Sequence, residues 1–152
     1  YRLLHGVDRR KRQMGIRDSV DALQTLYERY GYYGEKTHNL VMPGLDGLEK
    51  MAALMKDLRA EPPADIAGVA VTQRTDYSDG TITHCASGAV TASELKGSNV
   101  LRYALADGTV ILVRPSGTEP KIKVYILTKG ADAADRDANI EKYSAWVKTL
   151  TE

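Results

Sequence analysis

The sequence predicts an α+β fold, in which an antiparallel sheet carries helices gathered on one of its faces. The main evidence is the tight-turn dipeptide Asp107-Gly108 between two runs with strand patterning, because such a dipeptide joins neighbouring antiparallel strands. An alternating run at 122–128 follows closely, and amphipathic helical patterns lie at 45–59 and 131–149. Consecutive strands joined by short turns, with helices before and after them, are typical of this class.

A helix is expected near the start of the chain, over residues 18–30. Asp18 or Ser19 can cap its beginning, and Gly31 can end it. Its apolar side chains recur at helical spacing and form one face; they are Val20, Leu23, Leu26, Tyr27 and Tyr30. Because a lone helix with such a face needs a cover, we expect it to be loosely held, swapped or docked on a neighbouring molecule.

The remaining elements follow from changes between helical and strand periodicity along the chain. In chain order they are a linker at 31–36, a strand at 37–42, a helix at 45–59, strands at 69–76, 99–106, 109–113 and 122–128, and a closing helix at 131–149. Alternate residues of the last strand are apolar, which predicts that Ile122, Val124 and Ile126 point inward.

Two stretches have no predicted element. Residues 1–17 carry a basic cluster at 8–12, and we favour a solvated, poorly ordered terminus over a nucleic-acid contact, because no aromatic residues interleave with the cluster. Residues 75–97 are rich in Ser, Thr, Gly and Asp and show weak periodicity, so we expect them to be the least structured part. His84 lies there with no second ligand at metal spacing, and we expect an exposed loop histidine.

Composition limits the classes of function. The 152 residues are enough for one domain, or one domain with a tail. Twenty-one basic and 20 acidic residues give a net charge of +1, so no global field attracts nucleic acid or a membrane surface. The single cysteine, Cys85, excludes an internal disulfide framework and fits a reducing compartment. No apolar run approaches the roughly 18 residues of a membrane span, and we expect a cytoplasmic location.

The loop between the strands at 109–113 and 122–128 has the chemistry of an anion site. Arg114 offers a planar fork of donors that suits a phosphate or carboxylate. Gly117 lets backbone N–H groups approach an oxyanion closely. Ser116 and Thr118 add hydroxyl donors, and Lys123 adds positive potential.

Two features of the same loop leave its role open at this point. Glu119 should not face a phosphate, and we expect it to point away and to brace Arg114 or a lysine such as Lys121. Pro, Ser and Gly are also ordinary turn residues, so an ordinary hairpin loop explains the residues equally well.

The segment Arg114-Pro-Ser-Gly-Thr-Glu-Pro-Lys121, continuing to Tyr125, resembles the phosphate-binding loop of the last domain of α-D-phosphohexomutases, the phosphoglucomutase and phosphomannomutase family. The segment 27–33 resembles the join between the third and fourth domains of bacterial members, and 98–101 and Asp107-Gly108 also fit. The resemblance covers roughly residues 18–150.

This resemblance implies a particular architecture. The element order is similar to the TATA-binding-protein-like fold of the fourth domain, for which we expect a four-stranded antiparallel sheet with two helices on one face. Residues 18–36 are then a helix and linker from the end of the preceding domain, and residues 37–152 are the C-terminal phosphate-binding domain. Residues 1–17 remain an unassigned tail.

The resemblance also implies an activity for the complete enzyme. Members interconvert hexose 1-phosphate and hexose 6-phosphate, of glucose or mannose, through a phosphorylated serine and a bound Mg²⁺. The serine loop has no match here, since Thr91-Ala92-Ser93 is followed by Glu94. The metal loop needs clustered aspartates, and Asp76 and Asp79 do not make one. We therefore expect no catalytic residue and no metal ligand in this chain, which should be inactive alone, with Mg²⁺ bound outside it.

The resemblance assigns substrate-phosphate contacts to Arg114, Ser116, Gly117, Thr118 and Lys123. The expected partners are a hexose phosphate and the other domains of the parent enzyme, with neither nucleic acid nor membrane among them. Two other functions stay open: a non-catalytic regulatory module that binds a metabolite, and a nucleic-acid module. The latter would need a basic sheet face with exposed aromatic side chains, for which Tyr103 and Tyr125 are the candidates.

Overall fold

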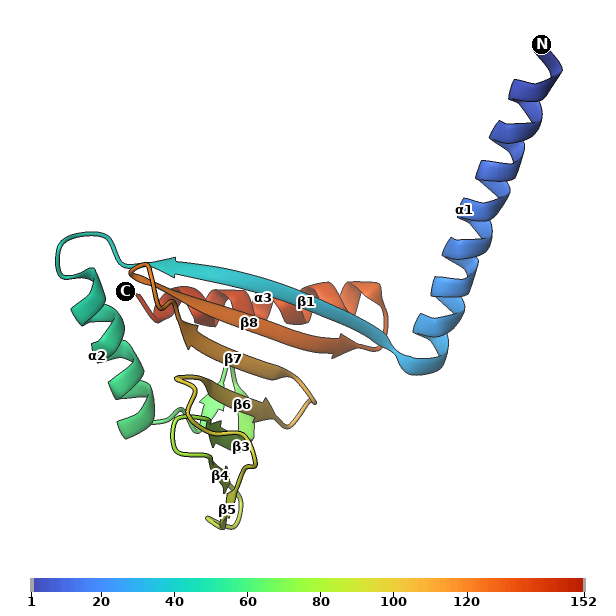
Figure 1. Ribbon diagram of the computed structural model, residues 1–152. Coiled ribbons are helices and arrows are strands. Elements are labelled where there is room, and N and C mark those ends of the chain that lie inside the picture. Colours follow the sequence, from blue (N-terminus) through green and yellow to red (C-terminus); the bar gives the residue numbers. More distant parts are fainter. Residues whose placement is uncertain (1, 152) are drawn as a thin grey trace.

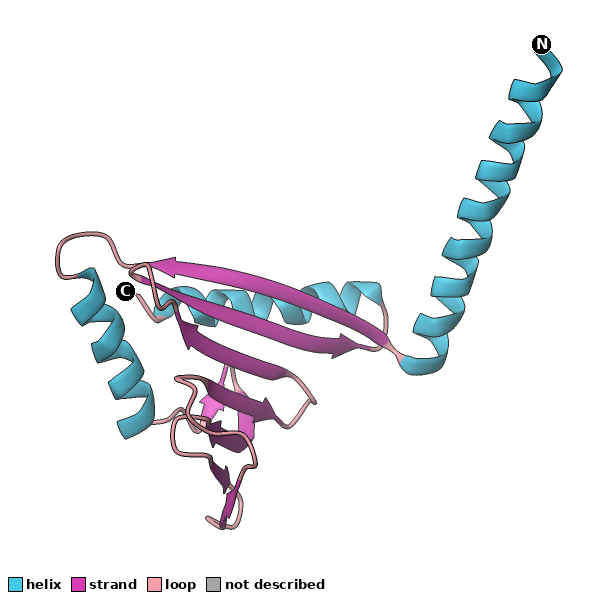
Figure 2. Cartoon of the chain, in the orientation of Figure 1, coloured by secondary structure: helices cyan, strands magenta, loops and turns pink. Residues whose placement is uncertain are grey.

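The computed structural model describes residues 2–151, and side chains at residue 15 and at residues 17–151. Three helices and an antiparallel sheet make up this part of the chain, which confirms the α+β class (Figures 1 and 2). The helices are α1 (Arg2–Tyr30), α2 (Gly47–Ala60) and α3 (Ala133–Thr149). The strands are β1 (Tyr32–Val41), β2 (Asp65–Ile66), β3 (Val69–Asp76), β4 (Thr81–His84), β5 (Val90–Ala92), β6 (Leu101–Leu105), β7 (Val110–Pro115) and β8 (Lys121–Gly130).

The strands form one sheet in the order β1-β8-β7-β6-β3-β4-β5, and β2 pairs with β3 beside that path. All the pairings are antiparallel. The longest is β1 with β8, which runs from Tyr32 opposite Gly130 to Val41 opposite Lys121. The predicted turn at Asp107-Gly108 joins β6 to β7, and the Asp107 carboxylate accepts a hydrogen bond from the Thr109 N–H at 2.9 Å. Gly108 has φ +84°, the left-handed region that favours glycine at such a turn.

Helices α2 and α3 cover the same face of the sheet. On β8 the alternation of inward Ile122, Val124 and Ile126 is confirmed, since all three are fully buried. Tyr103 of β6 lies on that face and donates a hydrogen bond to the carbonyl of Leu58 in α2 at 3.4 Å. The helices contribute Met55 of α2 and Tyr143 and Val147 of α3 to the core.

The opposite face of the sheet carries no helix among the described residues, and we call it the open face. Residues directly opposite each other in an antiparallel pair point to the same side. The open face therefore includes Arg114 and Leu112 of β7 together with their partners Lys123 and Tyr125 on β8. These four side chains are exposed or half-buried, whereas their neighbours Val113 and Val124 are fully buried.

The resemblance predicted four strands, and this number is wrong, because the sheet has eight strands within residues 2–151. Part of the difference lies in residues 75–97, where β4 and β5 replace the predicted irregular stretch. Both strands are short and rich in threonine, and they form because β4 pairs with β3 and β5 pairs with β4. Pairing with a neighbour stabilises strands whose own pattern is too short to predict them.

The expected linker at 31–36 is also different. Residues from Tyr32 onward belong to β1, because they pair with the second half of β8. The helix predicted at 18–30 is longer and begins at Arg2, so it includes most of the expected tail. Arg, Lys, Gln and Met in that tail favour helix, and an existing helix extends at little cost.

Helix α1 projects away from the rest of the molecule (Figure 1). Its apolar face is open to solvent, with Val20, Leu23 and Leu26 about half exposed at 58%, 47% and 52%. It meets the sheet at Tyr32 of β1, whose ring stacks on that of Tyr27 with centroids 5.0 Å apart and whose hydroxyl accepts a hydrogen bond from the Gln24 side-chain amide at 2.7 Å. In the part of the chain described, no helix combines the length and the hydropathy needed to cross a membrane.

Candidate functional site

The predicted anion loop is the connection between β7 and β8. The Ser116 N–H donates to the Lys121 carbonyl at 2.8 Å and closes the loop at its base. The Thr118 N–H donates to the Ser116 hydroxyl at 3.4 Å, a local turn across the tip. Gly117, Thr118 and Glu119 are exposed, and Ser116 is half-buried. The loop is therefore a short, internally bonded tip with its apex in solvent.

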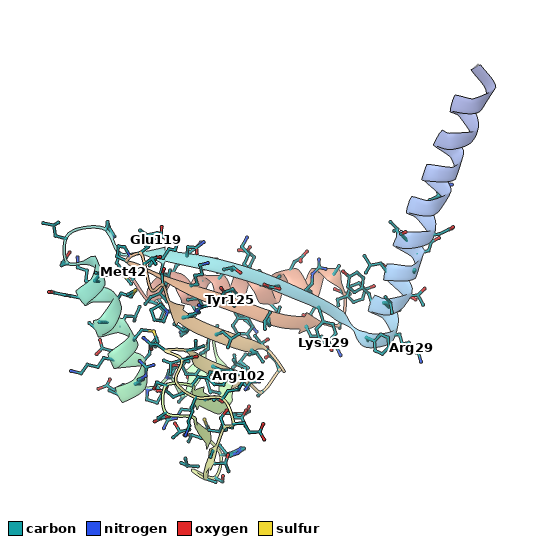
Figure 3. All side chains as sticks on the ribbon, viewed as in Figure 1. Arg29, Met42, Arg102, Glu119, Tyr125 and Lys129 are labelled. Carbon is teal, nitrogen blue, oxygen red and sulfur yellow. The ribbon has the colours of Figure 1, made fainter. Side chains whose placement is uncertain are left out.

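Two neighbouring segments hold this loop. The Met42 N–H, just after β1, donates to the Pro120 carbonyl at 2.8 Å. Gly47 begins α2 so close by that a side chain there would meet the Met42 carbonyl at 2.2 Å and Pro120 at 2.9 Å. Figure 3 shows Met42 and Glu119 at the same end of the sheet. The position of the loop is fixed by a strand end on one side and a helix start on the other.

Arg114 and Lys123 lie directly opposite each other on the open face. Asn39 of β1 lies opposite Lys123 on the other side, so three polar side chains form a row across three strands. Within residues 17–151, neither the guanidinium of Arg114 nor the ammonium of Lys123 has a hydrogen-bond or ion-pair partner. Like charges placed directly opposite destabilise a strand pair. This row therefore places two positively charged side chains next to each other at the base of the loop.

Gly117 is not required by the backbone of the loop. Its φ is not positive, and an added Cβ would meet nothing within 4 Å. The fold would accept a side chain at this position. The absence of one leaves the amide groups of the apex accessible, which is what close approach of an anion needs.

Glu119 lies where the sequence suggested, because its carboxylate forms an ion pair with Lys121 within the loop. The hydrogen bond from Lys121 lowers the pKa of Glu119, and the charge of Lys123 lowers it further. The carboxylate thus neutralises Lys121, and Arg114 and Lys123 remain as the charges available to an anion.

The other candidate residues from the sequence, His38, His84 and Cys85, lie in or directly beside strands. His38 lies on β1, as expected, but it is half-buried and its Nε2 is 2.8 Å from the Ser144 hydroxyl of α3. Burial lowers the pKa of His38, and the charges of Lys36 and Lys148 act in the same direction. The exposed loop position expected for His84 is wrong, because His84 ends β4 and is half-buried; Cys85 next to it is exposed. Across the described side chains, no three His, Cys, Asp or Glu residues gather as metal ligands.

Sequence reasoning missed Asn39 as a member of the row. Asn39 precedes Lys123 by 84 residues in the sequence, so no short motif contains both. The register of β1 against β8 brings the two together. The only signal in the sequence was the position of Asn39 in a run with strand patterning.

The fold and the loop together define an α+β domain with a cationic hairpin site on its open face. Comparison with known proteins gives the family. The model of the phosphoglucomutase/phosphomannomutase C-terminal domain matches residues 39–139. The chain therefore belongs to the phosphoglucomutase/phosphomannomutase family and corresponds to its C-terminal domain.

Curated relatives agree with this assignment. A phosphoglucomutase from Staphylococcus aureus (strain N315) is 33% identical over 115 residues, which are 76% of this chain and 21% of the relative. A phosphoglucomutase from Staphylococcus aureus strain bovine RF122 / ET3-1 is 34% identical over 109 residues, 72% of this chain and 20% of the relative. The chain thus spans about one fifth of the length of these relatives.

A solved structure, the open form of the exocytosis-sensitive phosphoprotein parafusin, a phosphoglucomutase from Paramecium, is also similar. Its TM-score is 0.44 at 18% identity, over 84% of this chain and 22% of that one.

Proposed function

We propose that this chain is the domain that binds the substrate's phosphate in a phosphohexomutase, which interconverts hexose 1-phosphate and hexose 6-phosphate. The observation that carries the proposal is that Arg114 and Lys123 lie opposite each other on the open face, at the base of the loop. Within residues 17–151 neither side chain has a hydrogen-bond or ion-pair partner. The family assignment supports it, since phosphoglucomutases act on sugar phosphates.

In this proposal the phosphate lies against the loop and receives three kinds of contact. Arg114 donates two parallel N–H bonds to its oxygens, and Lys123 supplies a second positive charge. The Gly117 amide and the hydroxyls of Ser116 and Thr118 donate to the remaining oxygens. None of these groups selects a sugar hydroxyl, so the loop would accept a phosphate at either end of the hexose.

Such a loop would act on catalysis through positioning. Holding the phosphate that does not react fixes the other end of the sugar for transfer, which reduces the entropy lost on reaching the transition state. A domain joined to the rest through a helix and a strand could also close over the cleft and exclude water. These roles require the remainder of the enzyme.

The reactive centre would lie on that remainder. In the family, Mg²⁺ supplies electrostatic stabilisation of the transferred phosphoryl group. The described residues do not fit a magnesium site, because no three acidic, histidine or cysteine side chains come together among them. In this proposal the metal and the phosphorylated serine belong to the rest of the enzyme, and we expect this chain to be inactive alone.

Titration of the ¹⁵N-labelled chain with glucose 1-phosphate and with inorganic phosphate, followed by NMR, tests the proposal. We expect saturable shifts at Gly117 and Thr118 and dissociation constants on the order of 1 mM, because one clamp supplies only about 4 kcal/mol. Arg114→Ala should abolish binding, and Gly117→Ala should weaken it without loss of stability. Lys56→Gln, an exposed lysine on α2, is the control for charge. Shifts clustered elsewhere, or normal binding by Arg114→Ala, would contradict the assignment.

A further inference from the structure

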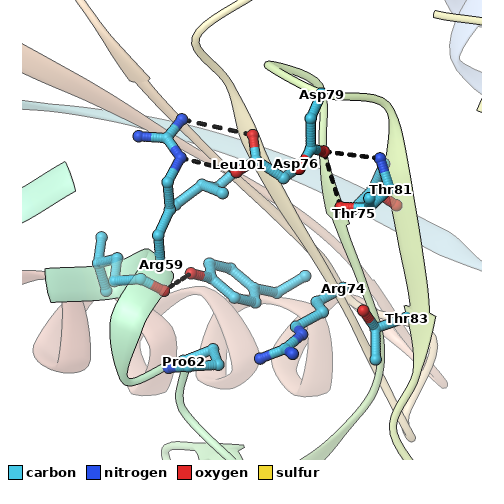
Figure 4. A pocket seen from close by; sticks show the side chains of 11 residues that line it. Arg59, Pro62, Arg74, Thr75, Asp76, Asp79, Thr81, Thr83 and Leu101 are labelled. Atoms are coloured by element: carbon cyan, nitrogen blue, oxygen red, sulfur yellow. Dashed lines mark hydrogen bonds and ion pairs between the residues drawn. The ribbon is translucent and has the colours of Figure 1, made fainter. Parts of the chain in front are cut away.

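A cavity lies on the helix-covered side of the sheet, between the end of α2 and strands β3, β4 and β6 (Figure 4). Its volume is about 280 Å³, near the lower end of the range of about 300–1,000 Å³ that is typical of ligand sites. Tyr103 and Leu101 provide apolar surface, and the polar walls come from Arg59, Arg74, Asp76, Asp79, Thr81 and Thr83. The anion loop is on the open face, so the two sites are separate.

Arg59 and Asp76 in the wall of this cavity already have hydrogen-bond partners within the protein. The Nε of Arg59 donates to Asp76 Oδ2 at 2.7 Å, and its Nη2 donates to Asn99 Oδ1 at 2.6 Å. Asp76 Oδ1 also accepts from the N–H of Ser78 at 2.9 Å. Burial raises the pKa of Asp76, but the hydrogen bonds from Arg59 and Ser78 outweigh that effect and leave it lowered. This pair forms a wall of the cavity and has little free capacity for a ligand.

Arg74 differs from Arg59 in having no such partner. It lies on β3, opposite Thr83 of β4 and Tyr103 of β6, and its side chain enters the cavity. It is half-buried, yet within residues 17–151 its guanidinium makes no hydrogen bond or ion pair. A guanidinium keeps its charge in proteins and its planar fork matches a carboxylate. An arginine partly removed from water without an acceptor indicates a place for an anionic group.

Asp79 supplies a second anchor at the other end of the cavity. Its Oδ1 accepts from the N–H of Thr81 at 2.9 Å and from the Thr81 hydroxyl at 2.8 Å. These bonds orient the carboxylate, which is exposed, and its Oδ2 makes no hydrogen bond or ion pair with the described residues. In Figure 4 Asp79 and Arg74 lie at opposite ends of the group of side chains. The cavity thus offers a donor fork at one end and an acceptor at the other.

The charge balance decides which anion fits. Two arginines and two aspartates line the cavity, so its formal charge is zero. A doubly charged phosphate ester on Arg74 would meet the repulsion of Asp76 and Asp79. A singly charged carboxylate would be paired by Arg74, and a hydroxyl or ammonium group on the same molecule could donate to Asp79.

We propose that this cavity binds a small monocarboxylate bearing a hydroxyl or ammonium group, with its carboxylate on Arg74 and its donor group on Asp79. The site is independent of the proposed phosphate site. It gives the domain a second ligand, of a different chemical class from a sugar phosphate.

NMR titration of the ¹⁵N-labelled chain with glycerate and with serine tests this proposal. We expect saturable shifts at Arg74, Thr81 and Thr83 with dissociation constants on the order of 1 mM. Arg74→Gln should weaken both ligands by about tenfold, the effect of losing one charge-assisted contact, and Arg74→Lys should weaken them less. Arg102→Gln is the matched control, because Arg102 lies on the neighbouring strand and bonds Gln73 away from the cavity.

The results separate this site from the phosphate site. Arg114→Ala should leave serine binding unchanged, and Arg74→Gln should leave phosphate binding at the loop unchanged. Saturable glycerate shifts that disappear in Arg74→Gln, while Arg102→Gln behaves as wild type, support the proposal. It is overturned if neither ligand gives saturable shifts at these residues, if both arginine variants bind equally well, or if inorganic phosphate binds this cavity more tightly than glycerate.

Discussion

The Tyr143 hydroxyl donates a hydrogen bond to the Asp107 carboxylate, and this contact ties α3 to the β6–β7 hairpin. The same carboxylate accepts from the Thr109 N–H at 2.9 Å and lies 3.8 Å from the ammonium of Lys142. Burial raises the pKa of Asp107, but the hydrogen bonds from Tyr143 and Thr109 outweigh that effect and leave it lowered. The turn that predicts the hairpin from sequence is thus also a docking point for the last helix.

Tyr143→Phe should reduce the free energy of unfolding by about 1.5–3 kcal/mol, the range for a hydrogen bond to a charged group. The ring remains to fill the core, so the loss should come from the hydrogen bond that the Asp107 carboxylate no longer accepts. Urea unfolding measures it, with Tyr125→Phe as the control, since Tyr125 lies on the open face. Equal stability of the two variants would show that the Asp107 contact contributes nothing.

The local pattern of the sequence is sufficient to predict β3, the hairpin of β6 and β7, and β8. The strand predicted at 69–76 coincides with β3, and the hairpin at Asp107-Gly108 and the alternation in β8 are both confirmed. Strands β4 and β5 could not be predicted in the same way, because they are short and their residues do not alternate. They depend on pairing with β3, which is a property of the sheet and not of the segment.

The two sites differ in how far their residues lie apart in the sequence, and this decides what could be predicted. The loop residues 114–118 could be predicted as a site because they are consecutive and together resemble the loop of a known family. That Arg114 lies directly opposite Lys123, with Asn39 beyond, follows only from strand register. The cavity at Arg74 and Asp79 had no signal, since its walls come from a helix, a turn and three strands.

The buried hydroxyls of Thr109, just before β7, and of Thr128 on β8 lie 2.8 Å apart. Thr128→Val keeps the shape but leaves the Thr109 hydroxyl buried without its partner, so we expect a loss of about 1–3 kcal/mol. The double variant Thr109→Val, Thr128→Val should recover most of that loss, because no buried hydroxyl then lacks a partner. Urea unfolding of the two single variants and the double variant completes the cycle. Additive losses would show that the pair is not coupled.

The His38 contact with Ser144 predicts a pH dependence of stability. Burial lowers the pKa of His38 in the folded state below its ordinary value near 6.5. The unfolded chain therefore binds a proton first as the pH falls, and the free energy of unfolding should decrease below about pH 6.5. His38→Gln should flatten this slope between pH 7.5 and 5.5 in urea unfolding. His84→Gln, which keeps the contact with α3, is the control and should retain the slope.

The opposed charges of Arg114 and Lys123 predict that stability and binding change in opposite directions. In the free chain the two cations repel each other across the strand pair, so Lys123→Gln should stabilise it by about 0.2–1 kcal/mol. The same change removes one charge from the proposed phosphate site and should weaken phosphate binding. Thermal unfolding without and with phosphate measures both effects: the variant should unfold at a higher temperature than wild type without phosphate and gain less from its addition. Lys56→Gln is the control for a lost charge. A variant that is less stable than wild type without phosphate would mean that Lys123 supports the sheet itself, and the pair would then be no evidence for an anion site.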